Sequence, residues 1–365
     1  MARRIVQMTS VHPAFDTRIY HKECRSLALA GYDVTLIAPY EGDELVRDGF
    51  RLRGVAPPRK RRERLTRTIN SVYRAAVDED AEIYHFHDPE LMPIGMLLKL
   101  RGKKVVYDVH EDYASNMQKQ WIPPTLRGPA SLAVRISEAT IARVCDHVVA
   151  ATPKIASQFA TRRTSVVQNF PRIAEFDSQQ GEPYTRREAI VAYVGYLANA
   201  RGLQEMAEAM RLVNGEVPAR LLMAGRMMQG AQAEGFGGAS HVEVLGESGR
   251  MQVAQLLSRA RIGIVVYHPT PNYYYGQPTK LLEYMAAGLP VVASDFPFYR
   301  EVIQSSGCGI LVDPLQPRQI ADAMLWLLRN EGSAEEMGKR GRQAVMERFN
   351  WENEARRLIS TYDKL

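Results

Sequence analysis

The feature that most constrains the fold is a repeated alternation between short apolar runs and longer segments with helical periodicity. The alternation extends through both halves of the 365-residue chain. Parallel strands need a crossover connection, usually a helix, so this pattern predicts an α/β fold with parallel sheets. The expected strands are 4–8, 33–39, 50–55, 82–86, 104–109, 147–151 and 165–168 in the first half, and 190–196, 220–224, 241–245, 262–267, 291–293 and 309–312 in the second half.

The two halves are separated by a polar stretch that carries prolines, 171–187. Such a stretch is typical of an interdomain linker, so we expect two domains rather than one. The length supports this division, because 365 residues are many for a single hydrophobic core and natural for two. Within the second half, the Gly-rich run from Gln229 to Gly238 is expected to form a mobile loop.

Composition places the chain among ordinary globular proteins, with 45% hydrophobic and 24% charged residues. We expect no membrane-spanning segment, and the basic start meets polar residues too early for a secretory signal. Cys24, Cys145 and Cys308 are far apart and follow no metal or redox spacing, so we expect them in the core of a cytoplasmic protein. The formal charge of +6 suggests an anionic partner, which could be a nucleotide sugar, a phospholipid surface or nucleic acid.

One stretch of the second half, Gly276 to Ser294, combines the features of a phosphate site. It reads GQPTKLLEYMAAGLPVVAS, so a loop with Gly and Pro leads into a helix and then into an apolar strand. The start of such a helix presents unpaired N–H groups near Thr279, and Lys280 adds a full positive charge. Glu283 follows one turn later, where its carboxylate could accept two ribose hydroxyls. The competing interpretation is an ordinary helix–strand unit with an exposed Lys–Glu ion pair.

This stretch closely resembles the nucleotide-sugar signature of the family-four retaining glycosyltransferases, which have the GT-B fold. The resemblance implies two Rossmann-like domains whose parallel sheets face a cleft, a UDP- or GDP-linked sugar as donor, and transfer with retention of configuration. It implies neither a metal ion nor another cofactor, and the chain shows no paired-aspartate metal motif. The usual signature has two Glu residues eight positions apart, and here Tyr275 stands where the first, which contacts the donor sugar, is expected.

A second part of the resemblance lies in the turn after the first strand of the second half. The turn is similar to the family's phosphate loop, with Arg201 and Gly202 in place of Lys–Gly, and Tyr196 in place of the first basic residue. Gly195 is then expected beside the donor. Arg201 can make a bidentate contact with phosphate, so we expect it to stabilise the diphosphate leaving group together with Lys280.

The resemblance covers the rest of the second half as well. Gly246 and Glu247 follow an expected strand at the position where the family's backbone reads the nucleotide base. The final segment, FNWENEARRLISTYDKL, is similar to the family's terminal helix, which crosses back to the amino-terminal domain. The expected divisions are an acceptor-side Rossmann-like domain over 1–170, a linker over 171–188, a nucleotide-sugar domain over 189–348 and a crossing helix over 349–365.

In the first half, polar residues follow two expected strands at the edge where open parallel sheets bind ligands. One strand ends at His87 and Asp88, and the next ends at His110 and Glu111. A lone His at such a place is more often a structural hydrogen-bonding residue, but two clusters favour a site. The resemblance implies that His110 is the catalytic-site histidine facing the donor sugar, with His87, Asp88 and Glu111 on the acceptor side.

The first loop supplies two more candidates. The turn after the first strand reads MTSVHPAFDTR and contains no Gly, so the fingerprint of an NAD-binding domain is absent. Arg18 and Lys22 fall one turn apart near the start of the following helix. In the resembling proteins this loop faces the cleft, so both side chains are candidates for contact with an anionic acceptor or with the donor diphosphate.

A basic segment lies between Arg51 and Arg74, where nine lysines and arginines accompany one acid. Apolar residues recur at helical spacing after Pro58, which predicts a basic amphipathic helix. Such a helix could hold the protein at an anionic membrane surface, or it could be a solvated face. The near absence of interleaved aromatic residues counts against binding of single-stranded nucleic acid.

These observations predict a cytoplasmic glycosyltransferase, with peripheral contact at the inner face of the plasma membrane. Its acceptor is expected to be lipid-linked or a saccharide, in cell-envelope, capsular or exopolysaccharide biosynthesis. Two other classes remain open, namely a nucleotide-sugar epimerase or hydrolase on the same scaffold, and a nucleic-acid-binding protein that uses the basic segment. Nucleotide-sugar consumption without a transfer product would indicate the first, and nucleic-acid binding that resists salt would indicate the second.

Overall fold

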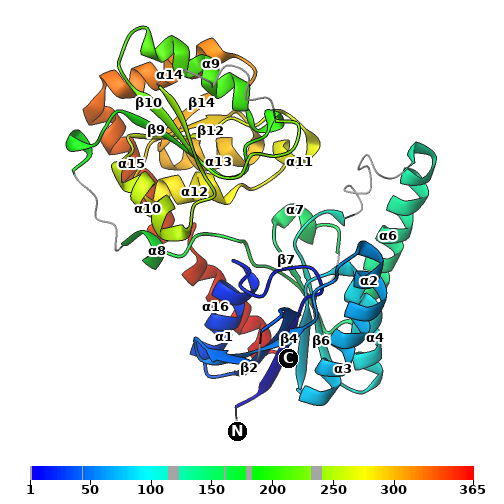
Figure 1. The fold of residues 1–365 in the computed structure, drawn as a ribbon. Coiled ribbons are helices and arrows are strands. Elements are labelled where there is room, and N and C mark those ends of the chain that lie inside the picture. The colour runs from blue at the N-terminus through cyan, green and yellow to red at the C-terminus, as the bar shows by residue number, and fades with distance from the viewer. Residues whose placement is uncertain (1, 43, 114–122, 160–161, 178–182, 232–240) are drawn as a thin grey trace. The chain divides into compact units, whose positions relative to one another are not determined.

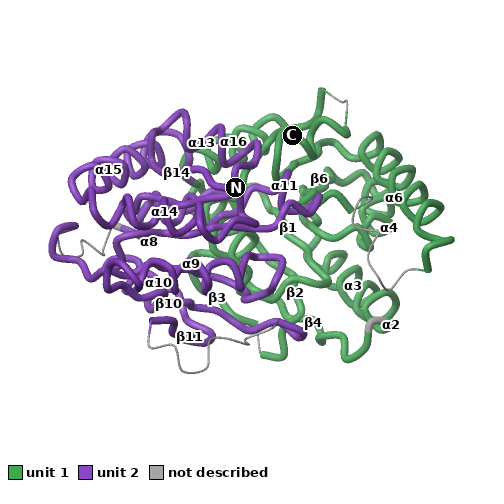
Figure 2. Tube along the Cα trace, turned by 90° about the horizontal axis from the view of Figure 1, so that it is seen from above, with its two compact units in different colours: residues 1–169, 351–365 green, residues 170–350 purple. Residues whose placement is uncertain are grey.

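The chain divides into two compact units, which are coloured separately in Figure 2. Unit 1 comprises residues 1–169 and 351–365, and unit 2 comprises residues 170–350. The computed structural model describes residues 2–42, 44–113, 123–159, 162–177, 183–231 and 241–365. The expected Gly-rich loop lies outside the described residues from position 232 onward.

Unit 1 is built on an eight-stranded sheet with helices on both faces (Figure 1). The strands run in the order β3-β4-β2-β1-β5-β6-β7-β8, and β3–β4 is the antiparallel pair in an otherwise parallel sheet. The expected strands are confirmed, whereas the short edge strand β3 was not predicted. The bounds are β1 Arg4–Met8, β2 Asp33–Pro39, β3 Leu45–Arg47, β4 Phe50–Val55, β5 Ile83–Phe86, β6 Lys104–Val109, β7 His147–Ala150 and β8 Thr164–Val166.

Two hydrophobic clusters cover the two faces of this sheet, because side chains alternate between faces along each strand. In β5, Ile83 packs in the cluster formed with η1, α1 and α16, and Tyr84 packs in the cluster formed with α3, α4, α6 and α7. His85 therefore shares the face of Ile83. The helix bounds are η1 Ile19–Cys24, α1 Arg25–Leu29, α2 Arg61–Glu63, η2 Arg64–Thr68, α3 Ile69–Glu79, η3 Pro89–Leu91, α4 Met92–Leu100, α6 Pro124–Val144, α7 Pro153–Ala156 and α16 Trp351–Asp363.

Unit 2 is built on a six-stranded parallel sheet in the order β11-β10-β9-β12-β13-β14, around a single hydrophobic cluster. The strand bounds are β9 Ile190–Val194, β10 Arg220–Ala224, β11 Val242–Gly246, β12 Ile262–Val265, β13 Val291–Ser294 and β14 Gly309–Val312. The helix bounds are α8 Ala174–Asp177, η4 Tyr184–Arg186, η5 Asn199–Arg201, α9 Leu203–Asn214, α10 Arg250–Arg259, α11 Pro271–Tyr274, α12 Thr279–Ala286, α13 Pro297–Ser306, α14 Pro317–Arg329 and α15 Glu331–Glu347.

Each sheet reverses its strand order at one point. In unit 2 the chain proceeds outward from β9 through β10 to β11 and then returns to β12 on the other side of β9. In unit 1 the corresponding reversal lies between β1 and β5. Open parallel sheets bind ligands beyond the carboxyl ends of their strands at such a switch point. The loops after β1 and β5, and those after β9 and β12, are therefore the places to look for a site.

The carboxyl-terminal helix α16 belongs to unit 1 although it follows unit 2 in sequence. Trp351 donates a hydrogen bond of 2.9 Å to the hydroxyl of Ser26, and Glu354 accepts one of 2.8 Å from the backbone of Gln168. The stretch expected to be a linker, 171–188, groups with unit 2, because Phe176 and Tyr184 pack in its core. Divisions therefore fall after residues 169 and 350, compared with expected ones after 170 and 348.

All three cysteines are buried, as their spacing predicted. Within the part of the chain that the structure describes, no helix combines the length and the apolar character needed to cross a bilayer.

Candidate active site

Three neighbouring strands of unit 2 end in glycines, and backbone hydrogen bonds connect these strand ends. Gly195, Gly225 and Gly246 follow or end β9, β10 and β11, and all three have positive φ, at 126°, 155° and 75°. The N–H of Gly195 donates to the carbonyl of Ala224 at 2.8 Å, and the N–H of Gly225 donates to that of Gly246 at 2.7 Å. A Cβ at Gly225 would collide with the carbonyl of Gly195, so this close approach of backbones requires glycine.

Two positively charged side chains lie beside Gly195. A Cβ added at this glycine would collide with Nζ of Lys280 and would lie 3.6 Å from Nη1 of Arg201. Arg201 ends the short turn η5 after β9, and Lys280 occupies the first turn of α12. Arg201 and Lys280 are 79 positions apart in sequence, yet both lie beside Gly195 at the point where the strand order of the sheet reverses. The missing side chain of Gly195 leaves the room that the ammonium group of Lys280 occupies.

Tyrosine rings surround the two cations. Nζ of Lys280 lies 4.6 Å from the ring centre of Tyr193 and 5.2 Å from that of Tyr267. The guanidinium of Arg201 lies 5.4 Å from the ring centre of Tyr267 and 5.6 Å from that of Tyr273. Nε of Arg201 also donates a hydrogen bond of 3.2 Å to the hydroxyl of Tyr273. Cation–π attraction, together with the hydrogen bond to Tyr273, therefore holds the two cations in place without neutralising their charge.

No carboxylate in the part of the chain that the structure describes pairs with either of these two cations. Among the described residues, neither Lys280 nor Arg201 has a carboxylate oxygen within the 4.0 Å of a salt bridge. Lys280 is only 8% exposed, and its burial, followed by the charge of Arg201, lowers its pKa to about 7 against the opposing influence of Glu283. A diphosphate would supply the missing negative charge, so the arrangement is that of an anion site.

The remaining donor-side candidates lie around this pair. Thr279 is the first residue of α12, whose initial N–H groups add to the positive field, and Glu283 is half-buried one turn after Lys280. Backbone hydrogen bonds connect the end of β11 at Gly246 to Gly225, and the end of β10 at Ala224 to Gly195 beside the cations. Glu247, which follows Gly246, is exposed. The structure thus brings Gly195, Arg201 and Lys280 into contact and places Thr279 and Glu283 on the same helix as Lys280.

Sequence reasoning missed two of the tyrosines that hold the cations, Tyr193 and Tyr267. Tyr193 lies inside β9 and Tyr267 follows β12, and both read in sequence as ordinary strand residues. A signal was present, since the run YVGY places Tyr193 and Tyr196 on either side of the phosphate-loop glycine. Tyr275, which replaces the first Glu of the family signature, is 53% exposed.

In unit 1, His87, Asp88 and His110 meet at the ends of β5 and β6. Nδ1 of His87 lies 3.0 Å from Nε2 of His110. Asp88 accepts hydrogen bonds from the hydroxyl of Thr9 at 2.7 Å and from the backbone of Ser10 at 2.6 Å, both in the loop after β1. The side chains of His87 and Asp88 are buried, while that of His110 is 12% exposed. His110 is therefore the member of this group that a ligand can reach.

The other acceptor-side candidates occupy different surroundings. Arg18 is buried and pairs with Glu23 at 2.8 Å and Asp108 at 3.0 Å, so its charge is neutralised within unit 1. Lys22 is buried and donates to the side-chain oxygen of Asn169 at 2.6 Å. Glu111 is exposed. Of the acceptor-side candidates, the structure groups His87 and Asp88 with His110.

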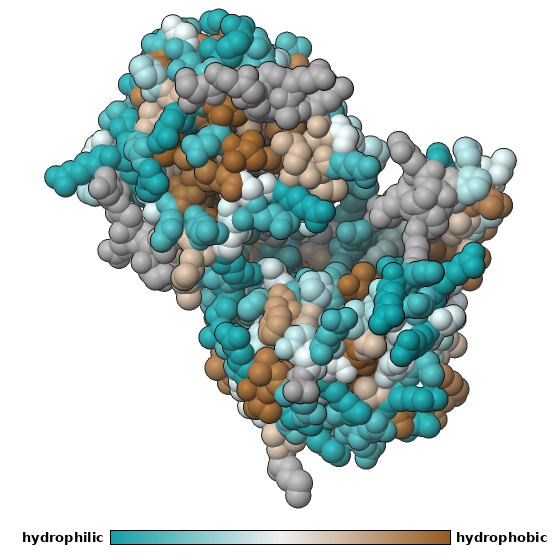
Figure 3. Space-filling model, viewed as in Figure 1, coloured by the Kyte–Doolittle hydropathy of each residue, from teal (hydrophilic) through white to brown (hydrophobic). Residues whose placement is uncertain are grey.

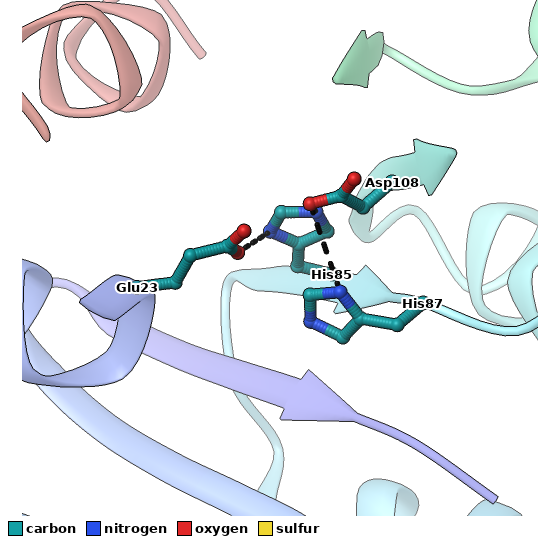
Figure 4. A group of neighbouring side chains, drawn as sticks. All are labelled: Glu23, His85, His87 and Asp108. Carbon is teal, nitrogen blue, oxygen red and sulfur yellow. Dashed lines mark ion pairs between the residues drawn. The ribbon is translucent and has the colours of Figure 1, made fainter. Parts of the chain in front are cut away.

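Figure 4 shows four buried side chains of the types that bind metal ions, Glu23, His85, His87 and Asp108. Their donor atoms lie within 4.8 Å of one another. A guanidinium already sits among them, because Arg18 pairs with both carboxylates, and a divalent cation beside it would be repelled. Burial, then the charge of His85, lowers the pKa of His87, while burial raises that of Glu23. The group is therefore a charge cluster centred on arginine and does not fit a metal.

Comparison with known proteins assigns both units to one class. Residues 18–170 match the description Glycosyltransferase Family 4, and residues 175–344 match Glycosyl transferases group 1. Together with the two parallel sheets, these matches define a glycosyltransferase of the GT-B fold. The chain belongs to the family-four-like glycosyltransferases, and the predicted fold class and enzyme class are confirmed.

Individual relatives agree with this assignment. The phosphatidyl-myo-inositol mannosyltransferase of Mycobacterium leprae is 25% identical over 304 residues, which cover 80% of this chain and 76% of that protein. The corresponding protein of Mycobacterium tuberculosis H37Rv is 26% identical over 350 residues, 91% and 88% of the two chains. Both cover the two units.

Solved structures share the fold at lower identity. Sucrose-phosphate synthase from Thermosynechococcus elongatus has a TM-score of 0.75 at 18% identity, covering 99% of this chain and 98% of that one. Anabaena HepE in complex with UDP and glucose has a TM-score of 0.73 at 14% identity over the whole of both chains. Family membership favours sugar transfer over the epimerase, hydrolase and nucleic-acid interpretations.

Proposed function

We propose that this glycosyltransferase moves a sugar from a nucleotide-diphospho-sugar, UDP- or GDP-linked, to a lipid-linked or saccharide acceptor with retention of configuration. The observation that carries the proposal is the pair of cations at Gly195, which is buried or half-buried and has no counter-ion among the described residues. A group with two negative charges close together fits this pair, and the diphosphate of the donor is such a group.

The reaction breaks the bond between the anomeric carbon and the diphosphate oxygen and forms a bond from that carbon to the oxygen of an acceptor hydroxyl, whose proton passes to the leaving diphosphate. Negative charge therefore collects on the diphosphate as it leaves. Arg201, Lys280 and the first N–H groups of α12 are fixed in advance around the position of that charge. Preorganised donors of this kind contribute about 3–4 kcal/mol each in other enzymes, so we propose that no metal ion is needed.

Other residues are assigned to the rest of the donor. Glu283 accepts the ribose hydroxyls, and the backbone at Gly246 and Glu247 faces the base. His110 contacts the transferred sugar, because its side chain is 12% exposed at the end of β6, next to the switch point of unit 1.

The acceptor and its location rest on the relatives and on the basic segment. Two relatives that cover both units are named as phosphatidyl-myo-inositol mannosyltransferases, which supports a lipid-linked acceptor and a role in envelope biosynthesis. The predicted helix is present as a continuous helical run from Arg61 to Glu79. Arg62 and Arg67 are exposed on it, whereas Arg64 pairs with Glu90 at 2.7 Å.

We therefore propose peripheral contact with an anionic bilayer through these exposed arginines, at about 1 kcal/mol each. Replacing Arg62 and Arg67 by Gln is expected to reduce cosedimentation with anionic liposomes at low salt. Wild-type protein that remains in the supernatant would contradict this contact.

The test of the proposed function is a thermal-shift screen with UDP-, GDP- and ADP-linked sugars, followed by product analysis. A donor at 100 times its Kd adds about 2.7 kcal/mol to stability, which is a clear shift. The matching nucleotide sugar is then incubated with acceptors that include phosphatidylinositol. Stabilisation by one nucleotide sugar together with a new glycoside supports the proposal. Absence of stabilisation by every nucleotide sugar would overturn it.

A further inference from the structure

We propose that a chain of hydrogen bonds starting at Tyr362 in α16 fixes the ring of His110, so that its Nε2 carries the proton and its Nδ1 accepts a ligand hydroxyl. The chain passes through Gln7 and His87. Tyr362, Gln7 and His87 are then positioning residues, because none of them needs to touch the substrate. The assignment of the ligand rests on the proposed function, whereas the hydrogen-bond chain does not.

The distances define one continuous path across unit 1. Nε2 of Gln7 donates to the hydroxyl of Tyr362 at 3.0 Å, and Oε1 of Gln7 lies 2.6 Å from Nε2 of His87. Nδ1 of His87 then lies 3.0 Å from Nε2 of His110. Gln7, His87 and Tyr362 are fully buried, so water does not compete for these bonds. The path joins α16 to β1, β5 and the end of β6.

The amide of Gln7 sets the direction of every proton on this path. Its Oε1 only accepts, so Nε2 of His87 must carry a proton. Burial lowers the pKa of His87, which keeps the ring neutral and leaves its Nδ1 as an acceptor. His110 must then donate from Nε2, and Oδ1 of Asp108, 3.4 Å from the same nitrogen, favours the same tautomer. In neutral His110 the other nitrogen, Nδ1, is an acceptor, and it has no hydrogen-bond partner among the described residues.

The orientation of the amide is itself held from the other side. The hydroxyl of Tyr362 receives the Gln7 amide and lies 2.6 Å from Nδ1 of His85. The carboxylate of Asp108 faces the other ring nitrogen of His85 and favours the proton there, so Nδ1 accepts from the hydroxyl. Nε2 of His85 then carries a proton and faces Asp108 at 3.6 Å. Without the hydroxyl, the amide could rotate and present its NH2 group to His87. That rotation would place the proton of His87 on Nδ1, opposite the proton on Nε2 of His110, and leave Oδ1 of Asp108 at 3.4 Å as the acceptor that still favours this proton.

Tyr362→Phe removes this hydroxyl, and Tyr84→Phe is its matched control. Tyr84 is equally buried in unit 1 and lies next to His85 in β5, but its hydroxyl bonds the backbone at Ala81 and Ala76 instead. Both variants lose one buried hydroxyl with two hydrogen bonds. They differ in whether the lost group belongs to the path that ends at His110.

The first measurement is the tautomer of His110 in the ligand-free protein, from long-range proton–nitrogen NMR spectra of labelled histidine. His110→Gln identifies its signals. We expect the Nε2–H tautomer in wild type and in Tyr84→Phe, and loss of this single tautomer in Tyr362→Phe. An Nδ1–H tautomer in wild type would overturn the inference, even if Tyr362→Phe failed to fold.

The second measurement is turnover with the nucleotide sugar found by the thermal-shift screen. We expect Tyr362→Phe to lower kcat by at least about tenfold with little change in the KM for the donor, because a misplaced catalytic group affects the chemical step. Tyr84→Phe should keep the wild-type kcat. Equal tautomers and equal kcat in the two variants would overturn the inference. A wild type that uses no nucleotide sugar would refute the proposed function alone, because the tautomer is measured without substrate.

Discussion

Both units bury a cation at the switch point of a parallel sheet, and they treat its charge in opposite ways. Arg18 in unit 1 is 4% exposed and lies between the carboxylates of Glu23 and Asp108. Lys280 in unit 2 is 8% exposed and lies between tyrosine rings, with a second cation, Arg201, nearby. One cation is neutralised by the protein, and the other is left charged or loses its proton.

This difference separates a structural charge from a binding charge. Burying a cation costs several kcal/mol, and the attraction of nearby carboxylates offsets that cost in unit 1. In unit 2 no described carboxylate forms an ion pair with Lys280, so a ligand has to bring most of the offsetting negative charge. Functional sites are where such local penalties persist in natural proteins. Burial and charge alone therefore do not identify a site, whereas a buried charge without a counter-ion does.

The contrast between the two cations would not hold if unit 1 were equally stable without Arg18. Arg18→Met leaves Asp108 and Glu23 without their cation, and breaking a buried pair in this way costs about 3–5 kcal/mol. We expect that loss in the free energy of unfolding, measured by urea denaturation. Arg62→Met is the control, because that side chain is exposed and its loss should change stability by less than about 0.5 kcal/mol. A stable Arg18→Met protein would show that the cluster does not depend on its guanidinium.

The opposite outcome is expected in unit 2. Lys280→Met and Arg201→Ala should each lower kcat/KM at least about tenfold, or roughly 1.4 kcal/mol, because the leaving diphosphate loses one cation. Lys280→Met should leave the stability of the unliganded protein unchanged or higher, since it removes an unpaired buried charge. Lys339→Met, an exposed change in the same unit, should alter neither quantity. Wild-type turnover in either site variant would remove that residue from the site.

The smallest expected effect is the pH dependence of donor binding that follows from the titration of Lys280, and it tests the charge of this residue most directly. Burial and the charge of Arg201 lower the pKa of Lys280 to about 7, so this side chain is mainly charged below pH 7 and neutral above it. A bound diphosphate favours the charged form, so binding above pH 7 requires uptake of a proton. Affinity is then highest at low pH and falls as pH rises. The Kd of the nucleotide sugar should increase about fivefold between pH 7 and 8.

Tyr193, Tyr267 and Arg201 do not change their charge in this range. Burial raises the pKa of both Tyr193 and Tyr267, and Arg201 stays charged. Calorimetry of the wild type and of Lys280→Met at both pH values is the measurement, and the variant should show no such change. A wild-type Kd that does not depend on pH would contradict the prediction.

The architecture was predictable because it depends on periodicity. The strands of both sheets appear in sequence as apolar runs, and they occur within a few residues of the expected positions. The edge strand β3 was missed because its three residues, Leu45–Arg47, are largely exposed and carry no apolar run. The loop after β9 and the start of α12 were also recognisable, since Gly195, Arg201 and Lys280 are small or charged residues in a distinctive order.

The surroundings of each charge were not predictable. Arg18 has the same sequence context as a surface cation at a helix start, and its burial depends on Asp108, 90 positions later. The tyrosines around Lys280 and Arg201 come from β9, from the loop after β12 and from α11, so nothing local marks them as a group. Pairing across the sheet is a property of the tertiary structure, and it decides whether a charge is neutralised.

The discontinuity of unit 1 sets an order of events during translation. Residues 170–350 complete unit 2 while α16 is still to be synthesised, and domains tend to fold as they leave the ribosome. Unit 2 can therefore acquire its cation pair before Tyr362 exists. Until α16 emerges from the exit tunnel and docks, Gln7 and His85 lack their shared hydroxyl. A nascent chain stalled before residue 351 would thus carry a finished anion site in unit 2 and a unit 1 that still lacks the hydroxyl of Tyr362.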